Sequence, residues 1–347
     1  MRTKMSVRSI GVLLLGLVIV VWLFVAGGCA RNHSSVVVYT ALDRNFSEPI
    51  FNTFTERTGI RVLAKYDTES TKTIGLVNTI IAEASRPRCD VFWNNEIVNT
   101  IRLKARGHLQ PIDPMQSALF PPAQRDTDRT WYGFAGRARV VIINDSIVPS
   151  GVSISGVGDL LDPRLAGRIG IAKPLFGTTA THASALFVKQ GNPWGEEFFT
   201  KLKANGVSIE SGNRMCAARV ANGGLVAALT DTDDAIEEIR AGKPVRIVFP
   251  DQGEGEMGTL LIPNTLSLIR GCPHPEEGKL LIDFLLSPEV EMMLAEGASA
   301  QIPLNVSYTN HHPLSPLPAK WMEVDYASAA ESFDEVASWL TTHFLEP

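Results

Sequence analysis

The sequence lacks the short motifs that mark most enzymes and metal proteins. Only 4 of its 347 residues are cysteines, and none of them forms the CxxC spacing of a zinc or redox site. It contains no GxSxG nucleophile motif, no HExxH zinc motif and no phosphate-binding loop of the GxxxxGK type. We therefore expect no enzyme activity and no resident cofactor, so that any bound metal ion would be cargo.

Also absent is an apolar run of the roughly 20 residues that a free-standing membrane span requires. The longest strongly apolar segment, Ile10–Val25, has 16 residues. The basic residues Arg2, Lys4 and Arg8 precede it, and the small residues after it end at Cys29. A basic start, an apolar centre and small residues before a cysteine are the layout of a bacterial lipoprotein signal.

This layout predicts both the compartment and the anchor. Residues 1–28 would be a signal peptide, and residues 29–35 would be a tether attached to the membrane through a lipidated Cys29. An uncleaved anchor or ordinary secretion would leave the following domain on the same side of the membrane. We therefore expect the protein at the periplasmic or cell-surface face of a bacterial membrane.

Positive charge is also in short supply. The net charge of −5 becomes −8 when residues 1–28 are removed, because they carry three basic residues and no acid. This balance excludes nucleic acid as a partner. The remaining 319 residues exceed the usual size of one hydrophobic core, which favours two lobes. We expect the cysteines in this part, Cys89, Cys216 and Cys272, to be mostly buried apolar residues.

After the tether, strand-like and helix-like segments alternate, as in an α/β protein. Val36–Tyr39 is continuously apolar and β-branched, which indicates a buried parallel strand. Two long apolar strands, Arg137–Asn144 and Gly258–Ile269, are placed to carry the chain into a second lobe and back. We further expect helices at 47–58, 72–84, 97–106, 275–286, 288–296 and about 327–344, and strands at 60–66 and 89–93.

Four segments carry a resemblance to a known family: 37–41 (VVYTA), 82–93 with DVFW at its core, 133–144, and 280–289 with its LLSPE turn. In these segments the chain resembles solute-binding proteins of ABC importers, in the group related to bacterial ferric-iron-binding proteins. The resemblance implies a two-lobed periplasmic-binding-protein type II fold with two crossover strands between the lobes. It implies a first lobe of residues 36–138 and 264–347, a second lobe of residues 139–263, and a ligand held in the cleft.

In open α/β sheets, ligands bind beyond the carboxyl ends of the strands, where loops and helix N-termini meet. Several loops there are rich in hydroxyl, amide and charged side chains, although Asp67 and Thr68 could simply cap a helix, and His182 could be a core histidine. The predicted ligand-binding residues are Thr40, Asp43, Asp67, Thr68, Lys72, Trp93, Asn94, Asn95, Glu96, Thr178, Thr179, His182, Asn213, Arg214, Asp231, Thr232 and Asp233.

The nature of the ligand stays open between two classes. The resemblance implies ferric iron, but the iron-binding relatives use adjacent tyrosines, and this chain has no Tyr-Tyr pair. A carboxylate site could replace them and hold a metal ion or an organic cation, because hard cations prefer anionic oxygen ligands; its residues would be Asp43, Glu96, Asp231 and Asp233. A phosphonate, a phosphorylated compound or another organic anion is equally consistent, held by cationic side chains and helix N-termini.

These expectations combine into one functional hypothesis. The chain would be a monomeric solute-binding component of an ABC importer, which closes on a small polar molecule or metal ion and delivers it to a complex of permease and ATPase. Its contact with the membrane would be the lipid anchor. The alternative is a receptor of the same build that presents its ligand-bound form to a sensory partner.

Overall fold

Strands of the described residues join in a single sheet path that has two parts. The computed structural model describes residues 34–67, 73–308 and 312–346, so Cys29, Thr68 and Lys72 lie outside the described residues. All elements below belong to the unit Ser35–Pro347. Within the described residues, no helix is both long enough and apolar enough to cross a bilayer.

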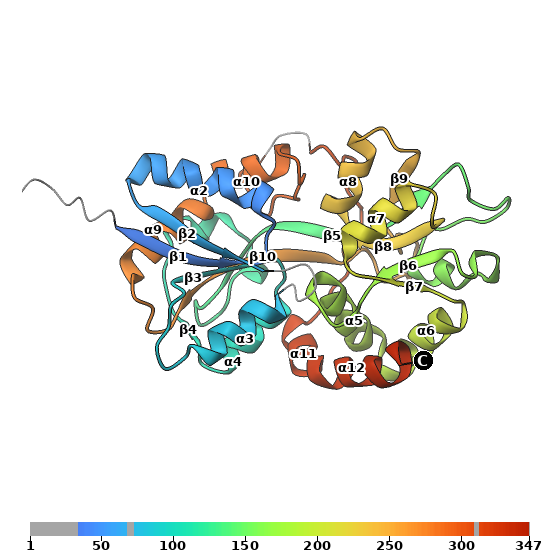
Figure 1. The fold of residues 1–347 in the computed structure, drawn as a ribbon, viewed down its shortest axis with the longest axis horizontal. Coiled ribbons are helices and arrows are strands. Elements are labelled where there is room, and N and C mark those ends of the chain that lie inside the picture. The colour runs from blue at the N-terminus through green and yellow to red at the C-terminus, as the bar shows by residue number, and fades with distance from the viewer. Residues whose placement is uncertain (1–33, 68–72, 309–311, 347) are drawn as a thin grey trace, which may run out of the picture. The chain divides into compact units, whose positions relative to one another are not determined.

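The first part of the sheet has parallel strands at its outer side. β1 pairs in parallel with both β2 and β3, and β10 pairs with β3 in the antiparallel sense. Figure 1 shows helices on both faces, with α2 and α10 above and α3 and α4 below. The elements are β1 (Ser35–Thr40), α2 (Arg44–Thr58), β2 (Arg61–Tyr66), α3 (Ile74–Ala82), β3 (Val91–Asn94), α4 (Val98–Ala105), β4 (Leu109–Gln110), β10 (Leu261–Ile269), α9 (Pro275–Leu285) and α10 (Pro288–Glu296).

The second part repeats this arrangement with different strands. β6 pairs in parallel with β7 and β8, and α7 and α8 cover one face while α5 and α6 cover the other (Figure 1). The elements are β6 (Ile169–Ala172), α5 (Gly177–Gln190), α6 (Asn192–Ala204), β7 (Ser208–Glu210), α7 (Asn213–Ala221), β8 (Ala227–Asp231), α8 (Thr232–Arg240) and β9 (Val245–Val248). Short 3-10 turns lie at Met115–Leu119, Pro122–Gln124, Val157–Leu161 and Pro163–Leu165.

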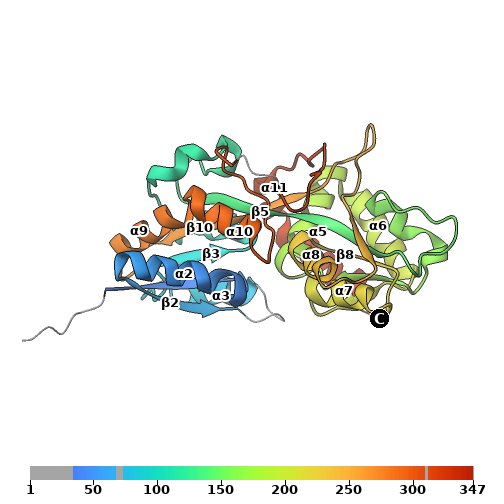
Figure 2. The ribbon, with the colours of Figure 1, turned by 90° about the horizontal axis from the view of Figure 1, so that it is seen from above.

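The long strand β5 (Tyr132–Asn144) belongs to both parts. Its first half pairs with β10 up to Ala138, and its second half pairs with β8 from Arg139 onward. Figure 2 shows β5 and β10 running side by side between the two sets of helices. A register shift between Pro263 and Asn264 interrupts the pairing of these strands at the crossing. The fold is therefore the two-lobed α/β architecture with two crossover strands that the sequence predicted.

The C-terminal helices do not lie where we predicted. We assigned residues 264–347 to the first lobe, but Val336, Leu340 and Phe344 belong to the core beneath β6 and β8. They are spaced four residues apart along one helical face, and rings of the same segment pack on the helices of that lobe: Trp339 on Phe187 of α5 and Phe344 on Phe199 of α6. The helices are α11 (Tyr326–Glu331), α12 (Phe333–Trp339) and a π-helical turn at Leu340–Leu345. The other lobe boundaries stay a prediction.

Candidate functional site

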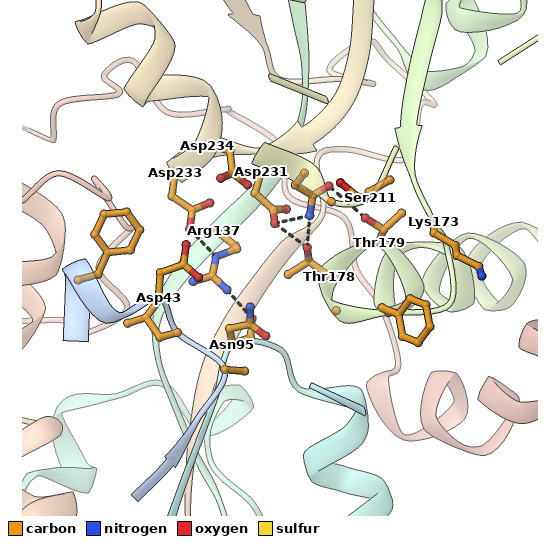
Figure 3. Close-up of a pocket in the computed structure, with 18 residues that line it drawn as sticks. Asp43, Asn95, Arg137, Lys173, Thr178, Thr179, Ser211, Asp231, Asp233 and Asp234 are labelled. Carbon is orange, nitrogen blue, oxygen red and sulfur yellow. Dashed lines mark hydrogen bonds and ion pairs between the residues drawn. The ribbon is translucent and has the colours of Figure 1, made fainter. Parts of the chain in front are cut away.

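A polar pocket lies between the two parts, beyond the carboxyl ends of β1, β3, β6 and β8 (Figure 3). It holds about 560 Å³ of empty space, part of which is open to solvent. Its lining residues are Ala41, Leu42, Asp43, Phe46, Asn95, Arg137, Ala172, Lys173, Phe176, Gly177, Thr178, Thr179, Ser211, Gly212, Asn213, Asp231, Asp233 and Asp234. Residues from both lobes therefore face one another across a single space.

The N-termini of α5 and α7 both open into this pocket. The residue that precedes α5 is Phe176, and the residue that precedes α7 is Gly212; neither has a side-chain oxygen, and neither helix has a side-chain cap. The first backbone N–H groups of a helix have no partner inside the helix, and a cap normally satisfies some of them. Two uncapped N-termini at one pocket present N–H donors and positive dipole ends to a bound group.

Asp231 lies beneath these two helix ends and is fully engaged by neighbours. One carboxylate oxygen accepts from Nη1 of Arg139 at 2.6 Å, and the other accepts from the Thr178 hydroxyl at 2.5 Å and the Asn213 amide at 2.9 Å. The Arg139 side chain is completely buried. A buried guanidinium requires such a partner, because an unpaired charge in the interior is strongly destabilising. Asp231 is therefore the counter-ion of Arg139.

The side chains at the two helix ends hold each other in place. The Asn213 amide also donates to Thr178 at 2.9 Å, and its oxygen accepts from Thr179 at 3.1 Å and from Arg139 at 3.0 Å. His182, one turn further along α5, faces Nε of Arg139 at 3.4 Å. Burial first, and Arg139 second, hold the pKa of His182 well below its ordinary value, so this imidazole is neutral. The charged groups of this network below the helix ends are therefore one cation, Arg139, and one anion, Asp231.

A second buried arginine joins the lobes in the middle of the pocket. Arg137 donates from Nε to Asp233 at 3.1 Å and from Nη1 to the carbonyl of Asn95 at 2.6 Å (Figure 3). Burial alone would lower the pKa of this guanidinium, but nearby carboxylates, Asp233 foremost, raise it above its ordinary value. Arg137 therefore stays charged and neutralises part of the acidic side of the pocket.

The structure brings together seven of the predicted ligand-binding residues. Those that line the pocket are Asp43, Asn95, Thr178, Thr179, Asn213, Asp231 and Asp233. Asp67 and Arg214 line a neighbouring, more open space that shares Asp43 with the first. Arg214 reaches from α7 to within 3.4 Å of Asp43, across the boundary between the lobes.

Six predicted residues are buried away from the pocket lining. Trp93 packs in the first core, with its ring edge-on to Phe51 at 5.6 Å and tilted on Phe134 at 5.3 Å, and it does not line the pocket. The Thr232 hydroxyl accepts from the backbone of Ala138. The other four, Thr40, Asn94, Glu96 and His182, are buried and bonded to protein groups. Their polar atoms have structural partners, which explains their burial.

The predicted group of four carboxylates is therefore not assembled. Glu96 is completely buried and accepts from Asn94, Asn99 and Thr181 rather than facing Asp43 or Asp233. A different acidic group forms instead, because the carboxylates of Asp231, Asp233 and Asp234 lie within 4.8 Å of one another and could hold a metal ion. Two of these three are the ones paired with buried arginines.

Sequence reasoning missed the two arginines. Both Arg137 and Arg139 were visible only as interruptions of an apolar strand. Two cations within a strand that is buried at every position must find carboxylates, and that requirement could have indicated their role. Ser211 and Lys173, which also line the pocket, were not predicted either.

Comparisons with known proteins agree with this architecture. A family described as bacterial extracellular solute-binding protein matches residues 99–330. "Iron uptake protein A1" of Synechocystis sp. is 25% identical over 294 residues, which cover 80% of this chain and 79% of that protein. A "putative 2-aminoethylphosphonate-binding periplasmic protein" of Salmonella typhimurium is 28% identical over 143 residues, covering 40% of this chain and 42% of that protein.

Solved structures share the fold over nearly the whole of their length. Iron-bound HitA from Pseudomonas aeruginosa superposes with a TM-score of 0.79 at 23% identity, covering 88% of this chain and 98% of HitA. AfuA from Actinobacillus pleuropneumoniae, solved with fructose-6-phosphate, gives 0.79 at 18% identity and covers 90% and 99%. The family match over most of the chain, the two-part sheet and the pocket between its parts place this chain in the family of bacterial extracellular solute-binding proteins.

Proposed function

We propose that this chain is the lipid-anchored, extracytoplasmic solute-binding component of an ABC importer, and that its solute is a small organic molecule with a phosphonate, phosphate or carboxylate head. Family membership supports the binding and transport role. The choice of ligand class rests on one observation, the convergence of the uncapped N-termini of α5 and α7 on the pocket.

The pocket suits an anionic head in three respects. Helix N–H groups favour oxyanions, and a second helix end doubles the number of available donors. Thr178, Thr179 and Asn213 are locked among themselves, so the donors are held in position before a ligand arrives. Arg139 lies directly behind them. Relatives are named for 2-aminoethylphosphonate or were solved with fructose-6-phosphate, which is the same head-group chemistry.

Ferric iron is the second candidate, because the carboxylates of Asp231, Asp233 and Asp234 are close enough to share an ion. Iron-binding relatives support it by name. Against it, Asp231 already accepts three hydrogen bonds, and Asp233 is paired with Arg137. No tyrosine is among the residues that line the described pocket. Both arguments favour the organic anion.

Thermal unfolding of the full chain in the presence of a ligand panel tests the proposal. The panel contains 2-aminoethylphosphonate, inorganic phosphate, a sugar phosphate, ferric citrate and a polyamine. A ligand at 100 times its Kd stabilises the native state by about 2.7 kcal/mol. We expect this shift from an organic phosphonate or phosphate and none from ferric citrate. A shift from iron alone would contradict the ligand class, and no shift from any compound would contradict the receptor function.

A further inference from the structure

The Glu96 carboxylate is a contact between the lobes. Glu96 follows β3 and precedes α4, and it is completely buried. Within the first lobe it accepts from the Asn94 amide at 2.8 Å and from the backbone N–H of Asn99 at 3.1 Å, so that it caps the start of α4. Its other oxygen accepts from the Thr181 hydroxyl at 2.7 Å, and Thr181 belongs to α5 of the second lobe.

Thr181 lies on the helix whose N-terminus faces the pocket. It is three positions after Thr178, which lines the pocket, and at 1.5 Å per residue this is a short distance along one rigid helix. The side chain of Thr181 is itself completely buried. A ligand held at the first turn of α5 therefore fixes the same helix that carries the hydroxyl bonded to Glu96.

This hydrogen bond is shielded from water, because both of its residues are completely buried, and an apolar cluster joins the neighbouring helices. Val98 of α4, Ala180 of α5 and Ala329, Ala330 and Phe333 of the C-terminal helices form one small buried cluster. Figure 1 shows α11 beside α4 and below α5. A hydrogen bond to a carboxylate is stronger than one between neutral groups, and water cannot replace it while the cluster is closed.

We propose that the Glu96–Thr181 hydrogen bond is a latch that holds the two lobes in the closed arrangement and slows their separation. The bond joins the turn before α4 to α5 directly and can exist only while these two segments are in contact. Glu96 is then a closure residue rather than a ligand of the cargo. That the latch also retains bound solute rests on the function proposed above; its effect on lobe separation does not.

Hydrogen exchange of the full chain in detergent measures lobe separation without any ligand. Thr181→Val removes the hydroxyl and keeps the shape of the side chain. We expect amide exchange in α4 and α5 to become about tenfold faster, which corresponds to about 1.4 kcal/mol in the opening equilibrium. Thr181→Ser, which restores a hydroxyl, should return the exchange to that of the unaltered chain.

Thr100→Val is the matched control. Thr100 is as buried as Thr181, but its hydroxyl bonds only within the first lobe, to Asn94 and Thr265. It should lower global stability without accelerating exchange in α5. Equal exchange of α5 in the unaltered chain and in Thr181→Val would overturn the latch, as would acceleration by Thr100→Val of the same size.

Dissociation of a probe adds a second readout. With 2-aminoethylphosphonate, Thr181→Val should raise the dissociation rate about tenfold and leave the association rate nearly unchanged, because a closed-state contact acts after encounter. An unchanged dissociation rate would overturn the retention of solute. If this probe binds neither protein, the function proposed above loses its support, while the exchange experiment still decides whether the latch exists.

Discussion

At the scale of single residues, the site is controlled by two arginines that lie behind the acids rather than by the acids themselves. Asp231 and Asp233 were predicted to bind a ligand because they belong to an acidic run at the start of a helix. Their carboxylates are directed at Arg139 and Arg137, which arrive from β5. A carboxylate that neutralises a buried guanidinium has less charge left for a cargo cation. Pairing, rather than residue type, therefore decides what the pocket can bind.

This pairing predicts a non-additive pair of substitutions. Asp231→Asn leaves the Arg139 guanidinium buried without its counter-ion, and Arg139→Met leaves the Asp231 carboxylate without its own. Each should lower the free energy of unfolding by about 3 kcal/mol or more. The double variant should lose clearly less than the sum of the two, because it leaves no unpaired charge.

Urea denaturation of the four proteins measures this coupling. Arg246 and Asp145 supply the comparison pair, because they form an ion pair of 2.8 Å with both side chains about half exposed. Exposed pairs contribute little, so Arg246→Met with Asp145→Asn should be additive within error. Additive losses at Arg139 and Asp231 would mean that these two charges are not each other's main partner.

At the scale of elements, the N-terminal ends of α5 and α7 are the parts of these helices that face the pocket and could contact a ligand. Helices in proteins usually begin with Ser, Thr, Asp or Asn, yet these two begin after Phe176 and Gly212. By contrast, the Asp325 and Ser287 side chains cap α11 and α10. Uncapped helix ends are destabilising unless another group satisfies their N–H donors. Most helices of the described residues also lack a side-chain cap, but α5 and α7 open into the same pocket after residues that carry no carboxylate, which favours a ligand as the partner of their N–H donors.

Gly212→Asp turns this argument into a test. The backbone at Gly212 is extended, with φ −173°, so any residue can adopt it. A carboxylate there would cap α7 and place a negative charge at the pocket. We expect thermal stability without ligand to be kept or raised by about 1 kcal/mol, while binding of an organic phosphate or phosphonate falls at least tenfold.

Gly212→Ser is the control, since it supplies an uncharged cap of similar size. It should weaken binding less than Gly212→Asp does. Titration calorimetry of the full chain with 2-aminoethylphosphonate, a sugar phosphate and ferric citrate separates the two ligand classes. Tighter binding of iron by Gly212→Asp than by the unaltered chain, with no loss for the anions, would reverse the assignment of the pocket.

At the scale of the whole molecule, the fold was largely predictable and the site only in part. Alternating apolar segments indicated the order of strands and helices, and the long strands at Arg137–Asn144 and Gly258–Ile269 indicated the crossover. The sequence could not show which side chains face the cleft. Trp93 near the end of β3 and Asp43 after β1 look alike in this respect, but Trp93 packs in the core and Asp43 lines the pocket. Likewise, the helical segment from Tyr326 onward could have packed on either lobe, since an apolar face shows that a helix is buried but not which lobe covers it.

The anchor is the remaining whole-molecule prediction. If residues 1–28 are removed and Cys29 is lipidated, the domain that begins at β1 is tied to the membrane by only a few residues, which raises its concentration near a permease. Expression of the full chain in a bacterium fed a labelled fatty acid should then give a labelled protein in the membrane fraction. Cys29→Ser should abolish both the label and the membrane association, because a lipid chain contributes about 0.8 kcal/mol per buried methylene.

Cys216→Ser is the control, because Cys216 is buried in the folded domain and its substitution should not affect either property. If Cys29→Ser loses the label but stays in the membrane fraction, the anchor is an uncleaved apolar segment. If the unaltered protein is unlabelled and is released from the cell, it is secreted in the ordinary way.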